Sequence, residues 1–442
     1  MFEKMHAKVE WIWHAFVNGV RNRICVEEHP VQRMCALRSD GVMQLVSVDE
    51  RTSRALFATA YALYIFSAGW GATTFIGWGT VSRGDICGLM QVFALMFFLA
   101  KLLSQRYTLR QLIILAVSVA TAVATVVASH DYGALWIVVL VAACQGIELQ
   151  FVARVTCLAT AAVVVSAALG MMLGVCPAVF AQRGNTGVIR YSMGFSHTNL
   201  FANSMAVVGV AWFVSRVPSA RLVDLLVLAV SAMVIYVVTN ARTTTLALLF
   251  LLMVAIVYVL WGKAPSPYLA IGLFCLAMLV SLGLMLFYWE LPMGVRPELN
   301  HVLSDRPYYF SSYFGQLGFS LFGGDLVEAH VWHTSPATKG LALDNSYVSL
   351  MLGKGVVVFG AVVVSSLTCA VRAQRDIRYL PFLFALVFFS VAGFAENVAN
   401  SISMNFSLAC IAYLLYGVPA SADRHWDVPR VGCGGEIEGR SA

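Results

Sequence analysis

Charged residues are scarce in this chain of 442 residues. Asp, Glu, Lys and Arg together make up 12% of it, whereas hydrophobic residues make up 60% and the mean hydropathy is +0.78. Soluble globular domains contain about 25% charged residues, so this composition excludes that class. We therefore expect an integral membrane protein. Because lipid cannot satisfy free backbone polar groups, we expect it to be built of helices.

Several common functional motifs are also missing. The ten cysteines lie mostly inside apolar segments or near the termini, so we expect neither a disulfide framework nor a CxxC-type metal site. No Walker loop, GxSxG motif or dinucleotide fingerprint occurs, which argues against ATP hydrolysis and serine acyl transfer. His301, His330 and His333 lie near Asp325 and Glu328, but their spacing fixes no third ligand. We expect no metal and no other cofactor.

No secretory signal is visible, because residues 1–50 carry scattered charges and lack a continuous apolar segment. We expect residues 1–54 to form a cytoplasmic N-terminal extension, in part an amphipathic helix on the membrane surface. Residues 55–417 should form a transmembrane helical bundle with an extracytoplasmic loop over 290–345, followed by a cytoplasmic C-terminal tail over 418–442.

Apolar runs of roughly 20 residues, each long enough to cross ~30 Å of hydrocarbon, divide this bundle. We expect about twelve spans, near 55–79, 86–103, 111–129, 134–148, 155–180, 198–214, 222–239, 243–261, 268–288, 346–369, 379–395 and 401–417. The predicted fold class is an all-α polytopic membrane protein with about 12 transmembrane helices and a large, partly helical outer loop.

Positive charge is distributed unevenly between the two sides of these spans. With the N-terminus inside, 21 of the 29 Lys and Arg fall in inner segments, seven in outer segments and Lys354 within a span. Cytoplasmic loops are enriched in Lys and Arg, so both termini are predicted to be cytoplasmic. The outer arginines occur where this rule disfavours them, which makes them candidates for function.

The outer segment "RYSMGFSHTNLFANS" is the first candidate. It places Arg190 and His197 before the sixth span, with Asn199 and Asn203 one helical turn apart at its start. In a functional interpretation Arg190 receives an anion and the His or Asn side chains bind hydroxyls. The alternative is a polar helix start with Ser196 or Thr198 as its cap.

The segment "TNARTTTLALLF" places Arg242 at the start of the eighth span, next to three threonines. Arg binds phosphate or carboxylate through two parallel hydrogen bonds, and a helix N-terminus adds partial positive charge at the same place. The alternative is an arginine that only reaches to the membrane interface.

The loop from Glu290 to Asn345 has 56 residues and is rich in aromatic rings. Ser304 as a cap, Asp305 in the first turn and Pro307 soon after predict a short helix that presents Arg306 at its end. Such a loop can fold back over the bundle as a lid or as one wall of a site.

Two further charges, Glu396 and Lys354, lie beside or inside predicted spans, where an unpaired charge costs roughly 2.5 to 3.5 kcal/mol or more. Each should face a partner or a cavity. For Lys354 we favour a structural ion pair or a side chain that reaches to the interface. The flanking Gly353 and Gly355 would allow another helix or loop to approach.

Taken together, these motifs resemble a known family. GFSHTN, NARTTT, an outer loop with SDRPYYF and LFGGD, and then LDNSYVSLMLGKG follow one another over roughly residues 180–410. In order, spacing and side of the membrane they resemble the O-antigen polymerase and ligase superfamily, especially the Wzy-like capsular or exopolysaccharide polymerases. Each motif is weak alone, and the combination carries the resemblance.

The resemblance implies a glycan donor linked to polyprenyl diphosphate, an active site at the outer leaflet beneath a large loop, and no metal. It implies that Arg242 and Arg306 bind the diphosphate, with Arg190 assisting. Asn199, Asn345, Tyr347 and Glu396 are further predicted substrate-binding residues.

The position of the ligase branch's candidate base, a His before the Asn that starts the helix after the loop, is occupied here by Asp344. Asp344 is therefore a predicted catalytic residue that takes a proton from a sugar hydroxyl. A carboxylate is a weak base unless desolvation raises its pKa. In the alternative, Asp344 orients the acceptor hydroxyl and His197 or a loop histidine takes the proton.

The predicted function is an inverting, metal-independent glycosyltransferase that polymerises lipid-linked oligosaccharide repeats at the outer face of the bacterial cytoplasmic membrane. One alternative is a ligase that moves the glycan to a lipid or protein. Another is a transporter of lipid-linked sugars or small anions, which predicts internal repeats that are not obvious here. The predicted partners are the lipid-linked oligosaccharide, the membrane and a chain-length regulator or flippase, without nucleic acid.

Overall fold

The protein is described by a computed structural model. The description covers residues 42–44, 46, 48–78, 81–183, 187–329 and 343–419.

The described residues are mostly helical. The long helices are α3 (Glu50–Gly71), α4 (Arg83–Leu103), α5 (Leu109–Ser129), α7 (Leu149–Met172), α8 (Thr198–Arg216), α9 (Leu222–Thr239), α10 (Arg242–Trp261), α11 (Pro267–Phe287), α14 (Ser346–Arg372) and α15 (Leu380–Ala395). Shorter helices are α6 (Gly133–Ala143), α12 (Val295–Leu303), α13 (Arg306–Leu317) and α16 (Ala412–Tyr416), with 3-10 turns η2 (Tyr288–Glu290), η3 (Ile377–Tyr379) and η4 (Phe406–Ile411). Three antiparallel pairs of short strands join β1 (Val42–Gln44) to β4 (Arg106–Thr108), β2 (Gly77–Trp78) to β3 (Val81–Ser82), and β5 (Phe180–Arg183) to β6 (Val188–Tyr191).

Nine helices within the described residues are long and apolar enough to cross a membrane, which fits the predicted all-α membrane protein. They are α4, α5, α7, α8, α9, α10, α11, α14 and α15. The predicted count of about twelve is not confirmed. The span expected near 55–79 corresponds to α3, of 22 residues, which is not among the nine. The spans expected near 134–148 and 401–417 correspond to α6, of 11 residues, and to η4 with α16. A span needs about 20 residues, so these segments are short for that role.

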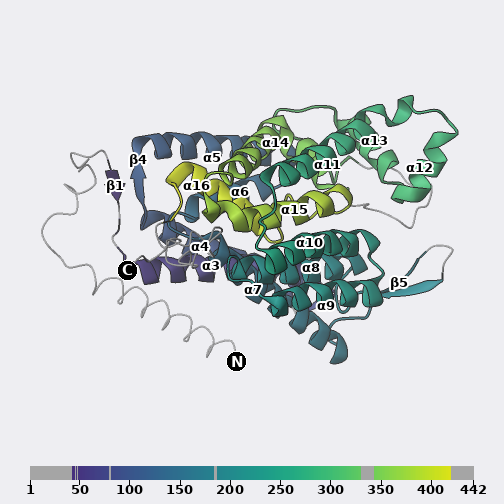
Figure 1. The fold of residues 1–442 in the computed structure, drawn as a ribbon, viewed down its shortest axis with the longest axis horizontal. Coiled ribbons are helices and arrows are strands. Elements are labelled where there is room, and N and C mark those ends of the chain that lie inside the picture. Colours follow the sequence, from purple (N-terminus) through teal and green to yellow (C-terminus); the bar gives the residue numbers. More distant parts are fainter. Residues whose placement is uncertain are drawn as a thin grey trace, which may run out of the picture.

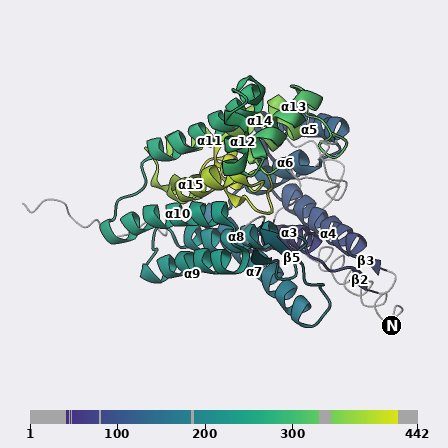
Figure 2. The ribbon, with the colours of Figure 1, turned by 90° about the vertical axis from the view of Figure 1, so that its right-hand side faces the viewer.

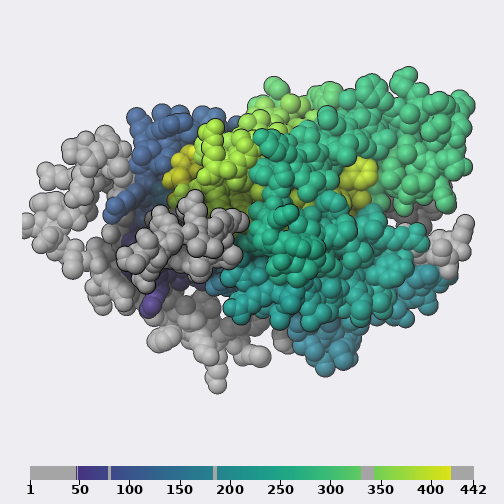
Figure 3. Space-filling model, viewed as in Figure 1, coloured from purple at the N-terminus to yellow at the C-terminus, as the bar shows by residue number. Residues whose placement is uncertain are grey.

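Helix α15 forms the centre of the bundle. It packs against α11 and α14 on one side and against α10 and α8 on the other (Figures 1 and 2). Of its span, 78% is buried, the highest share among the nine. Its aromatic side chains interlock with these neighbours, since Phe384 meets Phe213 of α8 and Tyr258 of α10 edge to face. In the space-filling view α10 and α11 form the centre of one face, and α12 and α13 lie at one end (Figure 3).

The outer loop forms two helices at that end. The predicted short helix is present as α13, but its N-cap is Asp305 rather than Ser304. Ser304 instead ends α12 in the left-handed region, with φ 55°, and Asp305 follows with φ 60°. Two consecutive left-handed residues reverse the chain sharply, so α13 turns back and packs on α11 and α14 with Phe310 buried.

Helix α14 is interrupted at Gly355, where φ is 84°. The backbone of the outer loop enters this break, because Val356 N donates to Ser320 O at 3.0 Å and Gly324 N donates to Leu352 O at 2.9 Å. Gly323 faces the break, and a Cβ there would lie 2.3 Å from the Gly353 carbonyl oxygen. The prediction that glycines here would admit another segment is confirmed.

We expect Gly355→Ala to destabilise the protein by about 3 kcal/mol or more. Alanine would have to adopt φ 84°, and its Cβ would lie 2.4 Å from both Gly323 N and Leu321 O. Gly360→Ala, on the same helix with no described atom within 4 Å of the added Cβ, is the matched control. Thermal unfolding of both purified variants in detergent tests this, and equal melting temperatures would contradict it.

Lys354 is buried next to this break and forms an ion pair with Asp131, in the turn between α5 and α6. The structural ion pair expected for Lys354 is therefore confirmed. One residue earlier in that turn, His130 Nδ1 lies 3.0 Å from Asp325 of the outer loop. The His130–Asp325 contact fastens the second half of the outer loop to this turn, away from the site described next.

Candidate functional site

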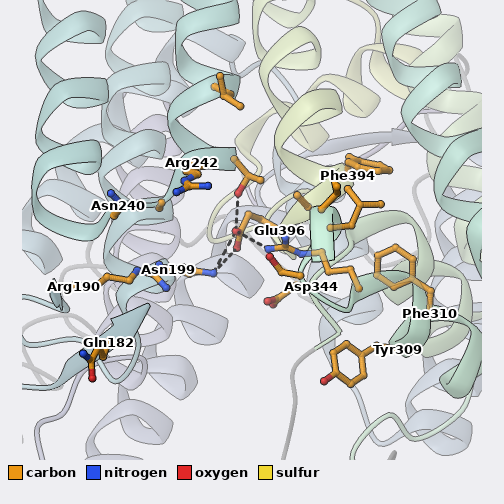
Figure 4. Close-up of a pocket in the computed structure, with 18 residues that line it drawn as sticks. Gln182, Arg190, Asn199, Asn240, Arg242, Tyr309, Phe310, Asp344, Phe394 and Glu396 are labelled. Atoms are coloured by element: carbon orange, nitrogen blue, oxygen red, sulfur yellow. Dashed lines mark hydrogen bonds and ion pairs between the residues drawn. The ribbon is translucent and has the colours of Figure 1, made fainter. Parts of the chain in front are cut away.

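A cavity of about 580 Å³ lies at the end of the bundle that carries α12 and α13. It is formed where β6, α8, α10 and α13 meet the C-terminal end of α15 and the residues that lead into α14. Six of the residues predicted from the sequence line it, and all of them except Arg306 are labelled in Figure 4. These are Arg190, Asn199, Arg242, Arg306, Asp344 and Glu396.

Local chain geometry brings the three arginines to this cavity. Arg190 lies in β6, directly before the turn that leads into α8. Arg242 is the first residue of α10, after a tight turn in which Asn240 adopts φ 49°. Arg306 is the first residue of α13. Because each arginine stands where an element begins or ends, all three reach the same end of the bundle.

The arginines differ in how far they are already engaged. Arg190 is held in place, since its Nε donates to Thr239 O at 2.5 Å and its guanidinium donates to Asn199 Oδ1 at 2.6 Å. Arg306 lies 3.4 Å from Glu396 Oε1, and its buried Nε has no hydrogen-bond partner among the described residues. Arg242 is exposed to the cavity and forms no hydrogen bond or ion pair with any residue that the structure describes. Donor groups of Arg242 and Arg306 are thus available to an anion.

Glu396 stands at the centre of a polar network just after the last residue of α15. Its Oε1 accepts from Asn199 Nδ2 at 3.3 Å and from Thr243 Oγ1 at 3.2 Å, and its Oε2 accepts from Asn203 Nδ2 at 3.2 Å. Together with Arg306, these contacts join four elements, α8, α10, α13 and α15, around one buried carboxylate. Such a network holds the cavity wall in a single arrangement.

Burial dominates the protonation of both carboxyl groups in the cavity. It raises the pKa of Glu396 to about 7, with a further upward contribution from Asp344 and an opposing one from Arg306. It also raises the pKa of Asp344, against the lowering effects of Arg306 and His197. A carboxylate with a raised pKa is a better proton acceptor, as the sequence-based role of Asp344 requires.

The raised pKa of Glu396 predicts a pH effect on stability. Between its unfolded value near 4.5 and its folded value near 7, the folded state binds more protons, so stability falls as pH rises. The Glu396→Gln variant lacks this titration. We therefore expect its free energy of unfolding, relative to that of the wild type, to increase by roughly 2 kcal/mol between pH 5 and pH 8. Melting temperatures at the two pH values test this, with the exposed Glu298→Gln on α12 as control. A difference in melting temperature between Glu396→Gln and the wild type that is the same at both pH values would contradict this prediction.

Asp344 is half-buried and lines the cavity, yet it forms no hydrogen bond or ion pair with any described residue. Figure 4 places it beside Glu396. A neighbouring second carboxylate and the nearby Arg306 set its electrostatic environment. Its oxygens are therefore available to a hydroxyl group of a ligand.

His197, the other predicted catalytic residue, is placed at the edge of the site. It is the N-cap of α8, and its Nδ1 accepts a hydrogen bond from Asn199 N at 3.2 Å. The alternative that Ser196 or Thr198 caps this helix is therefore wrong. A histidine with an unprotonated Nδ1 can accept the same backbone proton as a hydroxyl oxygen does. Burial lowers the pKa of His197, Asp344 opposes this shift and Arg190 adds to it.

Asn345 and Tyr347 are placed in the interior of the bundle and do not line the cavity. Asn345 caps α14 by accepting from Val348 N at 2.9 Å, and its Nδ2 donates to Ser281 Oγ and to the Phe394 carbonyl. Tyr347 donates to Ser390 O at 3.1 Å. These bonds fix the start of α14, and so the position of Asp344. Substrate contact by these two residues stays a prediction.

Some lining residues are not among the catalytic and substrate-binding residues predicted above. Gln182 reaches the cavity from β5, and Tyr309, Phe310 and Phe394 form an aromatic side opposite Arg190 and Arg242 (Figure 4). Gln182 is one residue beyond Ala181, the strand partner of Arg190, and this pairing is not readable from the sequence. Tyr309 and Phe310 follow Arg306 within about one turn of helix, so the predicted helix already indicated that they lie near Arg306.

Among the described residues, no group of three or more His, Cys, Asp and Glu side chains lies together as a metal site would require. Of the histidines considered for such a site, His301 is exposed on α12, and His330 and His333 lie outside the residues whose side chains are described.

Comparisons of the chain with protein-family models, with curated proteins and with solved structures found no match in any of the three. The geometry of the cavity therefore carries the functional argument. It combines anion-binding guanidinium groups, a carboxylate with no partner among the described residues, and aromatic rings in one half-open space. That combination suits the transfer of a group away from an anionic leaving group.

Proposed function

We propose that the protein is a glycosyltransferase that extends glycans carried on a polyprenyl diphosphate. The observation that carries this proposal is the meeting of Arg190, Arg242 and Arg306 with Asp344 in one cavity. The four residues come from segments up to 154 positions apart in the chain. A diphosphate needs several cationic donors, and a sugar hydroxyl needs a proton acceptor within reach.

In the proposed reaction, a hydroxyl oxygen of the acceptor glycan attacks the anomeric carbon of the donor sugar. A new C–O bond forms, and the bond from that carbon to the diphosphate oxygen breaks with its electron pair. The acceptor proton passes to the Asp344 carboxylate. The negative charge that develops on the leaving diphosphate is stabilised by Arg242 and Arg306, and Arg190 is fixed beside them through Asn199.

The surface of α10 supports a lipid-linked donor. Leu246, which lines the cavity, lies one turn after Arg242. From it a stripe of exposed aliphatic side chains with helical spacing runs the length of α10: Leu246, Leu249, Met253, Val257 and Leu260. A diphosphate bound at Arg242 would therefore place its hydrocarbon chain on an apolar surface within the bilayer.

Expression in a host that lacks its own polysaccharide polymerase tests this proposal. We expect the wild-type chain to convert single lipid-linked repeats into a ladder of multiples, separated by size on a gel. Arg242→Ala should reduce the ladder by about 100-fold or more. It should do so without loss of protein, because the Arg242 side chain has no partner among the described residues. Single repeats transferred to a lipid or protein, without a ladder, would indicate the ligase instead.

One observation favours a second candidate, transport of the lipid-linked glycan. Helix α14 is interrupted at Gly355 beside the buried Lys354, and interrupted helices with buried charge occur in transporters. The same host separates the two functions. Single repeats that move to the outer face without being joined would indicate transport and contradict the glycosyltransferase.

A further inference from the structure

A second cavity lies in another part of the fold and shares no lining residue with the first. It has a volume of about 440 Å³ and is bounded by α5, α6, α14 and the segment from η4 to α16. Its lining is almost wholly aliphatic, and the polar side chains among its lining residues are the hydroxyls of Ser118, Thr121 and Ser365. We refer to it as the α5–α14 groove.

The short helix α6 explains why the groove exists. Helices α5 and α14 are long enough to cross a membrane, whereas the 11 residues of α6 extend only about 16 Å. Helix α6 therefore fills part of the space between them and leaves the rest open to the bilayer. An apolar cavity of ~150 Å³ stays dry and takes up a hydrocarbon such as benzene. A groove about three times larger suits a hydrocarbon chain.

The charge at one end of the groove indicates the kind of lipid. Arg110 lies one helical turn before Ile114, a lining residue, and so on the same face of α5. It is exposed and forms no hydrogen bond or ion pair with any residue that the structure describes. At this end Gln111 Nε2 donates to Leu415 O at 3.2 Å, which ties α5 to α16.

The other side of α5 carries a second apolar crevice of about 290 Å³, between α4, α5 and α6. It shares Leu115 and Val138 with the α5–α14 groove. Tyr107, three residues before Arg110, lines it. Two apolar spaces thus flank one helix that begins with a cation unpaired among the described residues. This arrangement matches a lipid with two chains and one anionic headgroup better than a lipid with a single chain.

We infer that the α5–α14 groove binds one anionic phospholipid, with an acyl chain in the groove and its phosphate on Arg110. Cationic side chains at the membrane surface attract anionic lipids, and Arg binds phosphate oxygens through two hydrogen bonds. Because no residue is shared with the first cavity, the inference is independent of the proposed function.

Native mass spectrometry of the purified full-length protein tests the inference. The protein is titrated with phosphatidylglycerol and, in parallel, with phosphatidylcholine, and single-lipid adducts are counted. Arg110→Gln removes the headgroup contact, and Ala361→Phe fills the groove from α14. The matched controls are Arg51→Gln, exposed at the start of α3, and Val364→Phe, which is exposed on α14 and outside the groove lining.

We expect the wild type and both controls to bind phosphatidylglycerol in preference to phosphatidylcholine. Arg110→Gln should weaken phosphatidylglycerol binding about fivefold, the effect of one interfacial arginine, and remove the preference. Ala361→Phe should abolish the tight adduct. Equal binding by Ala361→Phe and Val364→Phe would overturn the assignment of the groove. Equal binding of the two lipids by the wild type would overturn the inference that the bound lipid is an anionic phospholipid.

Discussion

Arg306→Ala is expected to lower the rate of glycan extension by about 100-fold to 1,000-fold, the usual effect of removing one donor that stabilises a developing negative charge. Arg306 pairs with Glu396, acts electrostatically on Asp344, and has a buried Nε without a hydrogen-bond partner among the described residues. Synthesis of lipid-linked glycan by purified protein measures the rate. Arg306→Lys should restore only part of it, because an ammonium lacks the guanidinium fork.

A second variant separates binding of the diphosphate from a simple structural effect. Removing Arg306 leaves the buried Glu396 without its cationic partner, and this alone destabilises a site. In the double variant Arg306→Ala with Glu396→Gln neither charge of this pair remains. We expect its rate to stay low. Recovery to near the wild-type rate would show that Arg306 only neutralises Glu396. Arg51→Ala, which removes an exposed charge at the start of α3 outside the cavity lining, is the control and should be nearly neutral.

Asp344→Asn is expected to lower the rate by about 100-fold to 10,000-fold, the range of general base catalysis. Asparagine keeps the size of the side chain and one acceptor oxygen, so binding of the acceptor should change less than the rate. The control is Asp305→Asn, which removes the same charge from an exposed position outside the cavity lining. Asn also adopts the φ of 60° found there more readily than most residues.

The pH dependence of the rate distinguishes Asp344 from His197. A base acts in its unprotonated form, so the rate should rise with pH through the pKa of Asp344, which burial raises above its ordinary value. The same rise should persist in His197→Gln. If His197→Gln loses the activity and Asp344→Asn keeps it, the proton passes to the histidine and Asp344 only orients the acceptor.

The sequence predicted those parts of the site that depend on local signals. Arg242 stands after a tight turn at a helix start and Arg306 before a proline in the first turn of a helix, so their place at the ends of elements was readable. Composition and apolar run length predicted the membrane-spanning helices in the same way. Each of these signals lies within one helix or one turn.

The contacts between distant segments could not be predicted from the sequence. Glu396 meets Asn199 and Arg306 across 197 and 90 positions, and no spacing rule connects such residues. The insertion of the outer loop into α14 at Gly355 depends in the same way on backbone conformations that only tertiary packing fixes. The predicted span near 134–148 is not confirmed either. That run is mostly apolar, yet its helix ends at Ala143 after 11 residues.

The most direct test of the proposed function uses purified protein reconstituted into vesicles with a synthetic oligosaccharide on polyprenyl diphosphate. The expected result is a set of longer lipid-linked glycans and one free polyprenyl diphosphate for every bond formed, with both products lost in Arg306→Ala. If the wild type leaves the oligosaccharide unextended and releases no polyprenyl diphosphate, while intact donor crosses the vesicle membrane, the protein is a transporter and the proposed glycosyl transfer is wrong.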